Sequence, residues 1–337
     1  MILITGATGF VGGRMLETFT EYFGNQQVIG TGRNETAIES WKQKGVTIEK
    51  GDLSDAAFTQ SLFQKNAIKV VVHVAAKSSP WGTYESFYES NVVATRNLLE
   101  TATAAKVERL IYISTPSIYF NFKDRFGVKE NDPIDYEFVN AYTSTKYEAE
   151  LLVRKFARET NLFTVIFRPR AIVGRGDTVI IPRVLRAYEM GKLRIVGDGK
   201  NTADFTSVAN LCNAALLAMK ADERCNGEIF NITDGDPQNL WDFIRFLLKN
   251  MDLNSDLKQV PYPLAYSVAF LQEKFNEIFK PDTEPALTRY GIGILAKSLT
   301  MDISKAKELL GYQPIMNPRE SILEFIESIG SFKKFVE

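Results

Sequence analysis

The sequence predicts an α/β protein with a doubly wound parallel sheet and a smaller, interleaved C-terminal lobe. Short apolar segments rich in β-branched residues alternate with amphipathic segments through the first half, and several of the short segments are apolar on both faces. Strands buried on both faces are typical of parallel sheets that carry helices on each side. After Pro169 the alternation loosens. With 337 residues, 45% of them hydrophobic and 24% charged, the chain is long enough to bury such a core.

Each element is expected from its local pattern. Short β-branched runs predict strands over residues 2–5, 26–32, 46–52, 69–76, 109–115 and 163–169. Apolar residues at helical spacing predict helices over residues 12–23, 37–45, 55–65, 91–106 and 144–160. In the second half the same criteria predict a strand over residues 227–233 and helices over residues 234–250 and 303–310. We expect this half to cover the carboxyl edge of the sheet, where open α/β sheets bind ligands.

The first strand leads directly into the stretch TGATGFVGG, in which Gly6, Gly9 and Gly12 recur at every third position. A glycine-rich turn between a strand and a helix presents backbone N–H groups and the positive helix end to a pyrophosphate. Gly6 allows the tight turn, Gly9 the close approach of the ligand, and Gly12 the packing of helix on strand. We therefore expect a Rossmann-type, dinucleotide-binding domain. The expected boundaries are residues 1–168 with a returning segment at 203–233 for this domain, and residues 169–202 and 234–337 for a substrate-binding lobe.

The end of the second strand indicates which dinucleotide is bound. An acidic residue there suits the ribose 2′-hydroxyl of NAD, whereas an arginine suits the 2′-phosphate of NADP. In GTGRNE the acidic position is taken by Gly32 and followed by Arg33, so we expect NADP(H), with NAD(H) as the alternative. After the third strand, Asp52 is placed to accept a hydrogen bond from the adenine amino group, to cap the helix that begins near Ser54, or to do both at once.

Tyr142 and Lys146 lie four residues apart at the start of a predicted helix, so their side chains share one face. A tyrosine with its ordinary pKa of about 10 is a poor base near neutrality. A neighbouring ammonium and the charge of an oxidised nicotinamide both favour the phenolate, which would suit the pair to moving a proton on and off a substrate oxygen. Ser114 and Thr115 follow the preceding strand, where one hydroxyl would orient that oxygen or both would merely cap the strand.

Together these motifs resemble those of the extended short-chain dehydrogenase/reductases, within the NAD-dependent epimerase/dehydratase superfamily. The similarity runs nearly end to end and rests on TGATGFVG, GDLSD, HVAA, NVVATRNLL, STPSIY, the Tyr142–Lys146 pair and FRPRAIVGRGD. In the second half, GDGKNTADFTSVANLCNAALLA, GEIFNITDGDP and KAKELLGYQP are most similar to the 3β-hydroxysteroid dehydrogenase branch. That branch includes sterol-4α-carboxylate 3-dehydrogenases and bacterial reductases of long-chain β-keto acids.

The resemblance implies roles for individual residues. Tyr142 would be the acid/base, Lys146 would bind the nicotinamide ribose and lower the tyrosine pKa, and Thr115 would take the place of the family's catalytic Ser or Thr. Asn91 would shape the helix beside the active site, and Pro169 would lie against the nicotinamide carboxamide. By analogy, a homodimer would form through the helices that carry Asn91 and Tyr142. The residues expected to bind the cofactor are Gly6, Thr8, Gly9, Phe10, Val11, Gly12, Arg33, Asp52, Leu53, Val74, Ala75, Ala76, Ser114, Tyr142, Lys146 and Pro169.

The activity that the resemblance implies is the NAD(P)-dependent interconversion of a secondary alcohol and a ketone. The expected substrate is a small molecule that is bulky and apolar, either steroid-like or a long-chain β-hydroxy acid. A nucleotide-sugar epimerase or dehydratase is an alternative, and it would need cationic side chains that converge on a diphosphate. A non-catalytic dinucleotide sensor is a second alternative, although a sensor has no need of a complete acid/base set. The candidate cations are Arg170, Arg175, Arg183 and Arg186.

Composition and charge argue against several classes of partner. A net charge of −1 supplies no long-range field for nucleic acid or an anionic membrane. Met1–Ile4 carries no basic leader, and no apolar run approaches the roughly 20 residues of a spanning helix. Cys212 and Cys225 are too few for a disulfide framework and lack metal-ligand spacing. The single histidine, His73, lies in an apolar strand and is expected to be structural. We therefore expect a cytoplasmic protein without a metal site.

Two apolar features have more than one interpretation. The aromatic group of Trp81, Tyr84, Phe87 and Tyr88 would cover an apolar substrate or, more ordinarily, pack in the core. The segment Leu264–Leu271 would be a substrate lid, an interfacial helix or simply a helix packed on its neighbours. Neither feature distinguishes the function classes by itself.

Overall fold

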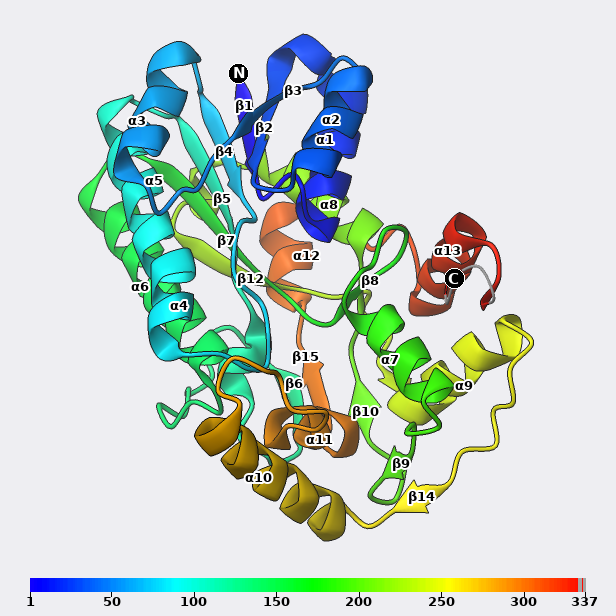
Figure 1. Cartoon of the computed structure of the whole chain (residues 1–337). Coiled ribbons are helices and arrows are strands. Elements are labelled where there is room, and N and C mark those ends of the chain that lie inside the picture. The colour runs from blue at the N-terminus through cyan, green and yellow to red at the C-terminus, as the bar shows by residue number, and fades with distance from the viewer. Residues whose placement is uncertain (333–334, 336–337) are drawn as a thin grey trace.

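The computed structural model describes residues 1–332 and 335 and has a seven-stranded sheet at its centre (Figure 1). All neighbouring strands of this sheet are parallel. Strands β1 to β3 extend the sheet in one direction, and the chain then returns to place β4 on the other side of β1. Ligands usually bind at such a reversal of strand order, in the crevice beyond the carboxyl ends of the strands. The structure confirms the predicted doubly wound α/β fold. The order is β12 (Glu228–Ile232), β7 (Phe163–Pro169), β5 (Arg109–Ile113), β4 (Val70–His73), β1 (Ile2–Thr5), β2 (Val28–Gly32) and β3 (Thr47–Lys50).

Helices cover both faces of the sheet and divide its core into two apolar clusters (Figure 1). Successive residues of one strand belong to different clusters, since Ile4 joins the first cluster and Leu3 the second. This alternation explains why the central strands are apolar at every position. On one face lie α1 (Phe10–Phe23), α2 (Glu35–Gln43), α8 (Val208–Ala218) and α12 (Ser304–Leu310), and on the other α3 (Ala56–Lys65), α5 (Ala94–Ala104) and α6 (Ala141–Glu159).

Several helices differ from their expected ranges; the one expected over residues 234–250, for example, begins only at Leu240. Two of the differences lie near the site. α1 begins at Phe10 because Gly9 is its N-cap, so Gly12 lies within the first turn. The helix expected over residues 91–106 is instead α5, preceded by a π-helical turn at Glu89–Val93 and by α4 (Tyr84–Tyr88). The Thr95 hydroxyl donates a hydrogen bond to the Asn91 carbonyl at 2.6 Å and so satisfies this irregular backbone. A π-helical turn commonly marks a functional region of a helix.

The second lobe and the large sheet exchange segments. The lobe sheet includes β6 from the first half of the chain, although this segment was expected in the dinucleotide-binding domain. In return, β12 from the second half completes the edge of the large sheet. The order of the lobe sheet is β13 (Gln238–Asn239), β10 (Thr202–Ala203), β15 (Leu299–Met301) and β6 (Arg125–Val128).

The helices of the lobe enclose a third apolar cluster centred on the fully buried Trp241. Two short strand pairs complete the lobe, namely β8 (Ile172–Val173) with β11 (Thr206–Ser207) and β9 (Ile195–Val196) with β14 (Gln259–Val260). Single 3₁₀ turns lie at Asn25–Gln27, Pro116–Tyr119 and Glu223–Cys225. The lobe helices are α7 (Ile180–Glu189), α9 (Leu240–Asn250), α10 (Tyr262–Phe279), α11 (Arg289–Ala296) and α13 (Pro318–Ile329).

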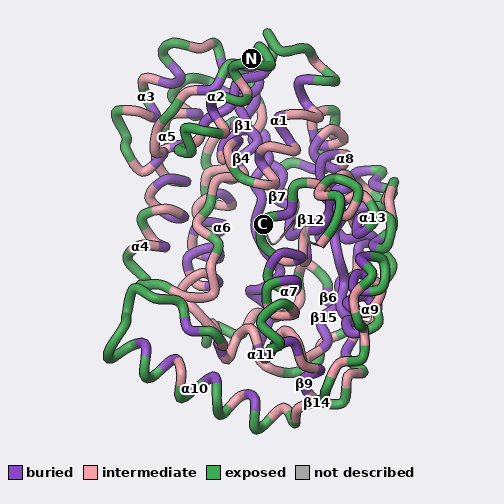
Figure 2. The backbone as a smooth tube through the Cα atoms, turned by 45° about the vertical axis from the view of Figure 1, so that its right-hand side comes forward, coloured by how far each residue is buried: buried purple, intermediate pink, exposed green. Residues whose placement is uncertain are grey.

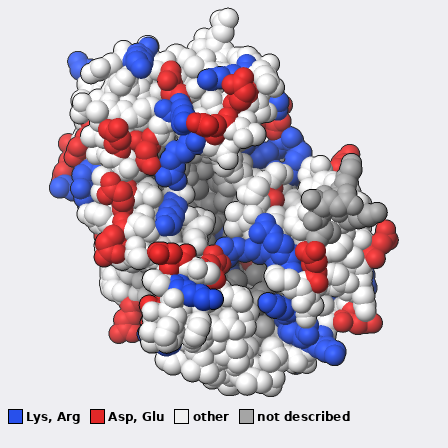
Figure 3. Space-filling view, viewed as in Figure 1, with Lys and Arg blue, Asp and Glu red and all other residues white. Residues whose placement is uncertain are grey.

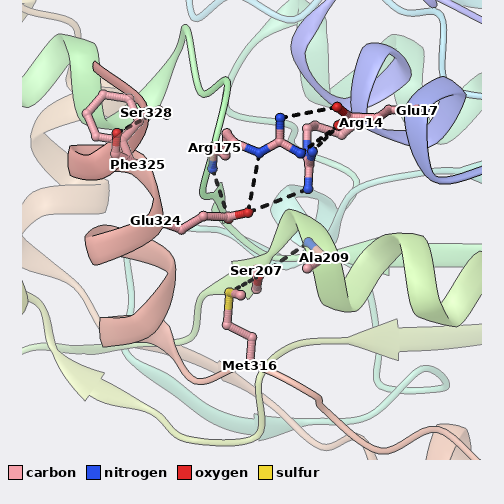
Figure 4. Close-up of polar contacts among 9 residues, drawn as sticks. All are labelled: Arg14, Glu17, Arg175, Ser207, Ala209, Met316, Glu324, Phe325 and Ser328. Carbon is pink, nitrogen blue, oxygen red and sulfur yellow. Dashed lines mark hydrogen bonds and ion pairs between the residues drawn. The ribbon is translucent and has the colours of Figure 1, made fainter. Parts of the chain in front are cut away.

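A polar cluster connects the lobe to α1 (Figure 4). Arg175, in the loop between β8 and α7, pairs with Glu17 of α1 at 2.7 Å, and its backbone N–H donates to Glu324 of α13 at 3.1 Å. Arg14 of α1 pairs with Glu17 and, at 3.5 Å, with Glu324. These contacts hold the β8–α7 loop beside the first turns of α1.

α10 lies at the periphery of the lobe, where much of its length is exposed (Figure 2). Ala265 and Ala269 are buried in the lobe core, whereas Leu264 and Leu271 are 57% and 65% exposed. Helix packing therefore accounts for only one face of the segment Leu264–Leu271. Within the described part of the chain, no helix combines the length and the apolar character that crossing a membrane requires.

Candidate active site

A cavity of about 520 Å³ lies beyond the carboxyl ends of the central strands and is also lined by the second lobe. The face of the molecule in Figure 3 is hollowed near its centre, with positive and negative side chains interspersed around the hollow. Every residue expected to bind the cofactor lines this cavity, and so does Thr115. Of the expected catalytic residues, Asn91 does not line it. Motifs that are spread over the first half of the chain thus converge on one cavity.

The glycine turn has the geometry that a pyrophosphate needs. Gly6 has a φ of +67°, and a Cβ there would stand 2.9 Å from the backbone of Ala75. A Cβ on Gly12 would stand 2.1 Å from the Gly6 carbonyl oxygen, so only glycine lets α1 approach the turn this closely. No side chain caps α1 at Gly9, which leaves the first N–H groups of the helix facing the cavity. The turn therefore fits an anionic diphosphate.

The end of β2 has no room for an acidic side chain. A Cβ on Gly32 would lie 2.3 Å from the Thr8 hydroxyl oxygen. The Arg33 guanidinium instead pairs with Asp52 at 2.9 Å, and Asp52 also accepts hydrogen bonds from the backbone and hydroxyl of Ser54. The helix-capping alternative for Asp52 is wrong, because α3 begins at Ala56 and its N-cap is Asp55. Asp52 is left to line the cavity beside Arg33.

His73 is buried at the end of β4 and has a partner for each ring nitrogen. The Thr5 hydroxyl oxygen accepts hydrogen bonds from two backbone N–H groups, at Val74 and Ala75, so it donates its own proton to His73 Nδ1 at 2.8 Å. Nε2 then carries the ring hydrogen and donates to the Thr95 hydroxyl at 2.9 Å. Burial, with the nearby charge of Lys146, lowers the pKa of His73 to about 3. His73 is therefore a neutral structural residue that joins β1, β4 and α5.

Lys146 extends from α6 to the end of β5. Its ammonium donates hydrogen bonds to the Tyr112 hydroxyl at 2.9 Å and to the Ile113 carbonyl at 2.7 Å. Burial lowers the pKa of Lys146 to about 7, although the Glu150 carboxylate acts in the opposite direction. The side chain lines the cavity beside Tyr142, where it could contact the ribose of a bound dinucleotide.

Tyr142 lies at the start of α6, one turn before Lys146. Burial is the larger cause and the neighbouring Tyr290 the smaller, and together they raise the pKa of Tyr142 to about 12. A hydrogen bond with Thr115 partly opposes this change. The pKa was expected to be lowered, but the Lys146 ammonium is turned toward Tyr112 and Ile113. The positive charge of an oxidised nicotinamide would act against the effect of burial. By its own residues, then, the chain keeps Tyr142 protonated near neutrality.

The hydroxyls of Ser114 and Thr115 point to different partners. Ser114 donates to the buried Glu150 carboxylate at 2.7 Å, and Glu150 also pairs with Arg168. Thr115 is the N-cap of the 3₁₀ turn at Pro116–Tyr119, and its hydroxyl donates to Ser117 at 3.1 Å. Ser114 is held by a buried carboxylate away from Tyr142, whereas the Thr115 hydroxyl is hydrogen-bonded to Tyr142, so Thr115 is the better placed of the two to contact a substrate oxygen.

Among the cavity residues that the sequence did not indicate, Ser117 and Tyr290 lie nearest the expected acid/base group. Their hydroxyl groups are hydrogen-bonded at 3.0 Å, which extends the polar chain from Thr115 to α11 of the lobe. Ser117 lies within the STPSIY motif, where a second hydroxyl two residues after Thr115 was the available signal. Tyr290 has no such signal, because only the packing of α11 brings it beside Tyr142.

Asn91 supports the site from behind the cavity. Its side-chain oxygen accepts from the Lys77 N–H at 2.7 Å, and its amide donates to the Thr145 hydroxyl of α6 at 3.1 Å. The residue therefore links the loop after β4 to the helix that carries Tyr142. This contact gives Asn91 a positioning role rather than a contact with substrate.

The aromatic side chains that follow β4 do not all pack together in one cluster. Phe87 is buried with its ring 6.4 Å from that of Tyr142. Tyr84 is exposed and donates to Glu148, and the Trp81 indole donates to the Pro281 carbonyl at 2.9 Å. Only Phe87 fits the core-packing interpretation fully.

Comparison with known proteins agrees with this geometry. Residues 2–233 match the NAD dependent epimerase/dehydratase family. A 2-alkyl-3-oxoalkanoate reductase of Shewanella oneidensis is 30% identical, over 95% of this chain and 84% of the relative. The 3beta-hydroxysteroid-dehydrogenase/decarboxylase isoform 1 of Arabidopsis thaliana is also 30% identical, over 98% of this chain and 80% of the relative. The structure of UDP-glucuronic acid 4-epimerase from Bacillus cereus with NAD superposes with a TM-score of 0.76, at 23% identity, over 100% of this chain and 99% of that chain.

The family match spans more than half of the chain, and the two relatives align over nearly all of it. The likeness to the epimerase concerns the fold, since the sequence identity is low. The chain thus belongs to the NAD-dependent epimerase/dehydratase family and is a nicotinamide-dinucleotide-dependent oxidoreductase of the extended short-chain dehydrogenase/reductase type.

Proposed function

We propose that this enzyme interconverts a secondary alcohol and a ketone on a bulky apolar substrate, either steroid-like or a long-chain β-hydroxy acid. The observation that carries the proposal is the half-buried Tyr142, which shares one cavity with Thr115, Lys146 and the glycine turn. The names of the relatives support the substrate class, because they describe a reductase of 3-oxoalkanoates and a 3β-hydroxysteroid dehydrogenase.

In this proposal Tyr142 moves the proton of the substrate oxygen. A bound dinucleotide supplies or removes the hydride at the reacting carbon. When the ketone is reduced, the Tyr142 hydroxyl donates its proton to the oxygen, and when the alcohol is oxidised the phenolate takes the proton back. The Thr115 hydroxyl orients the same oxygen and stabilises charge that develops on it. Burial raises the pKa of Tyr142, so near neutrality the residue is in the protonated form that donates during reduction.

The cofactor proposed is NADP(H), with NAD(H) as the alternative. Support comes from the end of β2, where Thr8 excludes an acidic side chain at Gly32 and Arg33 lies beside the cavity. A guanidinium at this place suits a 2′-phosphate, which takes two parallel hydrogen bonds from its planar fork.

The candidate arginines of the nucleotide-sugar alternative do not converge on the cavity. Arg175 pairs with Glu17, and Arg183 of α7 pairs with Glu284 at 3.2 Å. Of the four candidates, only Arg170 belongs to the described residues that line the cavity. A diphosphate bound by the lobe would meet one cation instead of several, which favours the dehydrogenase proposal.

Turnover of a substrate panel tests the proposed function. We expect net change in cofactor absorbance with a 3β-hydroxysterol or a long-chain 3-hydroxy acid, and none with a UDP-sugar. Tyr142→Phe should lower kcat by about 1,000-fold, because it removes the transferred proton. The same variant should bind the cofactor as the wild type does, as fluorescence titration would show. Conversion of a UDP-sugar without net cofactor turnover, or unchanged kcat in Tyr142→Phe, would contradict the proposal.

A further inference from the structure

The Arg170 side chain is a buried cation without an anion. It follows Pro169 directly after β7 and is only 7% exposed. Its guanidinium makes no hydrogen bond or ion pair with any described residue, and its Nε atom is both buried and unpaired. The backbone, by contrast, is held in place, since the Thr206 hydroxyl accepts from the Arg170 N–H at 3.0 Å and donates to its carbonyl at 2.8 Å. An unpaired charge in such a place is costly, so a partner that arrives with a ligand is expected.

The titratable groups that face Arg170 do not neutralise it. These groups are the Tyr290 hydroxyl and the Asp204 carboxyl, and neither forms an ion pair with the guanidinium. Asp204 accepts a hydrogen bond from the Met301 N–H at 2.6 Å, and burial raises its pKa to about 6. Burial also lowers the pKa of Arg170. The positive charge at Arg170 is therefore left for an anion outside the described protein.

The position of Arg170 points to the substrate rather than to the phosphates of the dinucleotide. The pyrophosphate belongs at the N-terminus of α1, and a 2′-phosphate belongs near Arg33 at the end of β2. Arg170 instead lies in the cavity with Tyr142 and Tyr290. The Tyr290 hydroxyl is hydrogen-bonded to Ser117 at 3.0 Å, within the polar chain from Thr115, and Tyr290 lines the cavity with both Tyr142 and Arg170, so the guanidinium lies at the same end of the cavity as the acid/base.

We propose that Arg170 binds a carboxylate that the substrate carries near its reacting carbon. This inference rests on the proposed function and narrows its substrate class to hydroxy and keto acids with a bulky apolar remainder. A guanidinium binds a carboxylate through two parallel hydrogen bonds, which fix the orientation of the substrate as well as its affinity. The Tyr290 hydroxyl is available as a further donor on the same side. Neutral sterols and simple alcohols, by this account, are poor substrates.

Matched substrates test the proposal in the wild-type protein first. 3-Hydroxydodecanoate and its methyl ester share the reacting carbon and the chain, and differ only in the charge of the carboxyl group. We expect kcat/KM for the acid to exceed that for the ester by about 100-fold, the ratio typical of a buried charged hydrogen-bonding pair. Equal kcat/KM values for the acid and the ester would overturn the role of Arg170 while leaving the proposed dehydrogenase function intact.

Variants then assign the preference to one residue. Arg170→Gln should lower kcat/KM for 3-hydroxydodecanoate by about 100-fold and leave the ester and the cofactor Kd nearly unchanged. Arg170→Lys keeps the charge and should recover part of the loss. Arg183→Gln is the matched control, because that arginine is already paired with Glu284 outside the cavity. If Arg170→Gln lowered kcat/KM for the acid and for the ester by the same factor, Arg170 would be only structural. The same conclusion would follow if Arg183→Gln lowered kcat/KM for the acid as much as Arg170→Gln does.

A binding measurement separates this inference from the proposed function. Dodecanoate cannot be turned over, and calorimetry with the cofactor-loaded protein should show that Arg170→Gln weakens its binding at least tenfold, while dodecanol binding changes little. If dodecanoate binds in this selective way but no hydroxy acid is oxidised, the inference stands and the proposed reaction is wrong. If Arg170→Gln changes the Kd of dodecanoate and the Kd of dodecanol by the same factor, the inference is wrong.

Discussion

The two ends of the cavity are built in different ways. At the dinucleotide end, the polar side chains already have protein partners: Arg33 pairs with Asp52, and Lys146 donates to Tyr112. At the substrate end, the Arg170 guanidinium is buried and has no hydrogen-bond or ion-pair partner among the described residues. The first end is composed of short motifs within the first half of the chain, whereas the second brings together segments far apart in sequence.

This difference in side-chain pairing indicates which kind of ligand each end of the cavity binds. A dinucleotide is bound largely by backbone N–H groups and a helix end, so its site is organised before the ligand arrives. An unpaired guanidinium is completed only when an anion enters, so binding at the substrate end depends on the charge of the ligand. Changes at the first end should therefore affect every substrate alike, and changes at the second should discriminate between substrates.

Among the changes at the dinucleotide end, Gly12→Ala should have the largest effect on cofactor binding. The added Cβ would stand 2.1 Å from the Gly6 carbonyl, so the turn must shift away from its present position. Hydrogen bonds from the turn to a charged phosphate are worth about 1.5–3 kcal/mol each, so losing one or two of them should raise the Kd of the cofactor by about 100-fold. Isothermal titration with NADPH would measure the change.

Gly13→Ala is the matched control for this variant. Its Cβ would meet the Ala7 carbonyl oxygen at an ordinary 3.4 Å, and Ala is the better helix former by about 1 kcal/mol. Cofactor affinity should stay unchanged and thermal stability should rise slightly. If both variants weakened cofactor binding equally, the close approach of α1 to the turn would not be what sets the affinity.

Lys146→Met tests a lysine that lines the cavity and whose buried charge lowers the free energy of unfolding. In the unfolded chain the lysine keeps its proton up to a pKa of 10.5, whereas in the folded protein burial lowers the pKa to about 7. Between these values the unfolded state binds more protons, so this lysine makes the free energy of unfolding rise with pH, by up to about 1.4 kcal/mol per pH unit. The burial penalty is present in full below pH 7.

The variant should lack this part of the pH dependence. Urea unfolding of both proteins at pH 6, 7.5 and 9 would show the wild type gaining stability relative to Lys146→Met as the pH rises. A difference that stays constant across this range would mean that Lys146 is not desolvated as the structure indicates. Turnover of the variant should fall in parallel at every pH, for acids and esters alike.

Arg33→Ala should have the smallest effect, because this side chain is 68% exposed at the rim of the dinucleotide end. We expect the KM for NADPH to rise about tenfold while the KM for NADH changes little, since only the 2′-phosphate uses the guanidinium. Steady-state kinetics with both cofactors would measure the ratio. A wild-type enzyme that already prefers NADH would contradict the proposed cofactor.

Much of the site was predictable because its residues lie in short motifs. The turn from Gly6 to Gly12, the Tyr142–Lys146 pair and Thr115 were all placed in the cavity from sequence patterns. The capping of α3 was assigned wrongly because Asp52 and Asp55 are both good caps in sequence, and only the observed start at Ala56 distinguishes them.

The ionisation of the site was not predictable in the same way. Spacing suggested that Lys146 would lower the pKa of Tyr142, but the effect of burial depends on every segment that packs around the phenol. Tyr290 is one such neighbour, and it reaches the site only through the position of α11. The exchange of β6 and β12 between the two lobes is equally a result of long-range pairing.

By itself, then, the sequence determined the doubly wound sheet, the dinucleotide turn and the acid/base pair. These features depend on local periodicity, on backbone groups that any chain with this glycine spacing would present, and on helical spacing between neighbours. Only the tertiary structure decided that the Ser114 hydroxyl is hydrogen-bonded to Glu150, that Thr115 lies beside Tyr142, and that Arg170 is buried with no anion paired to it among the described residues. Whether a charge has a partner depends on all of its neighbours in space, and the order of residues along the chain does not specify them.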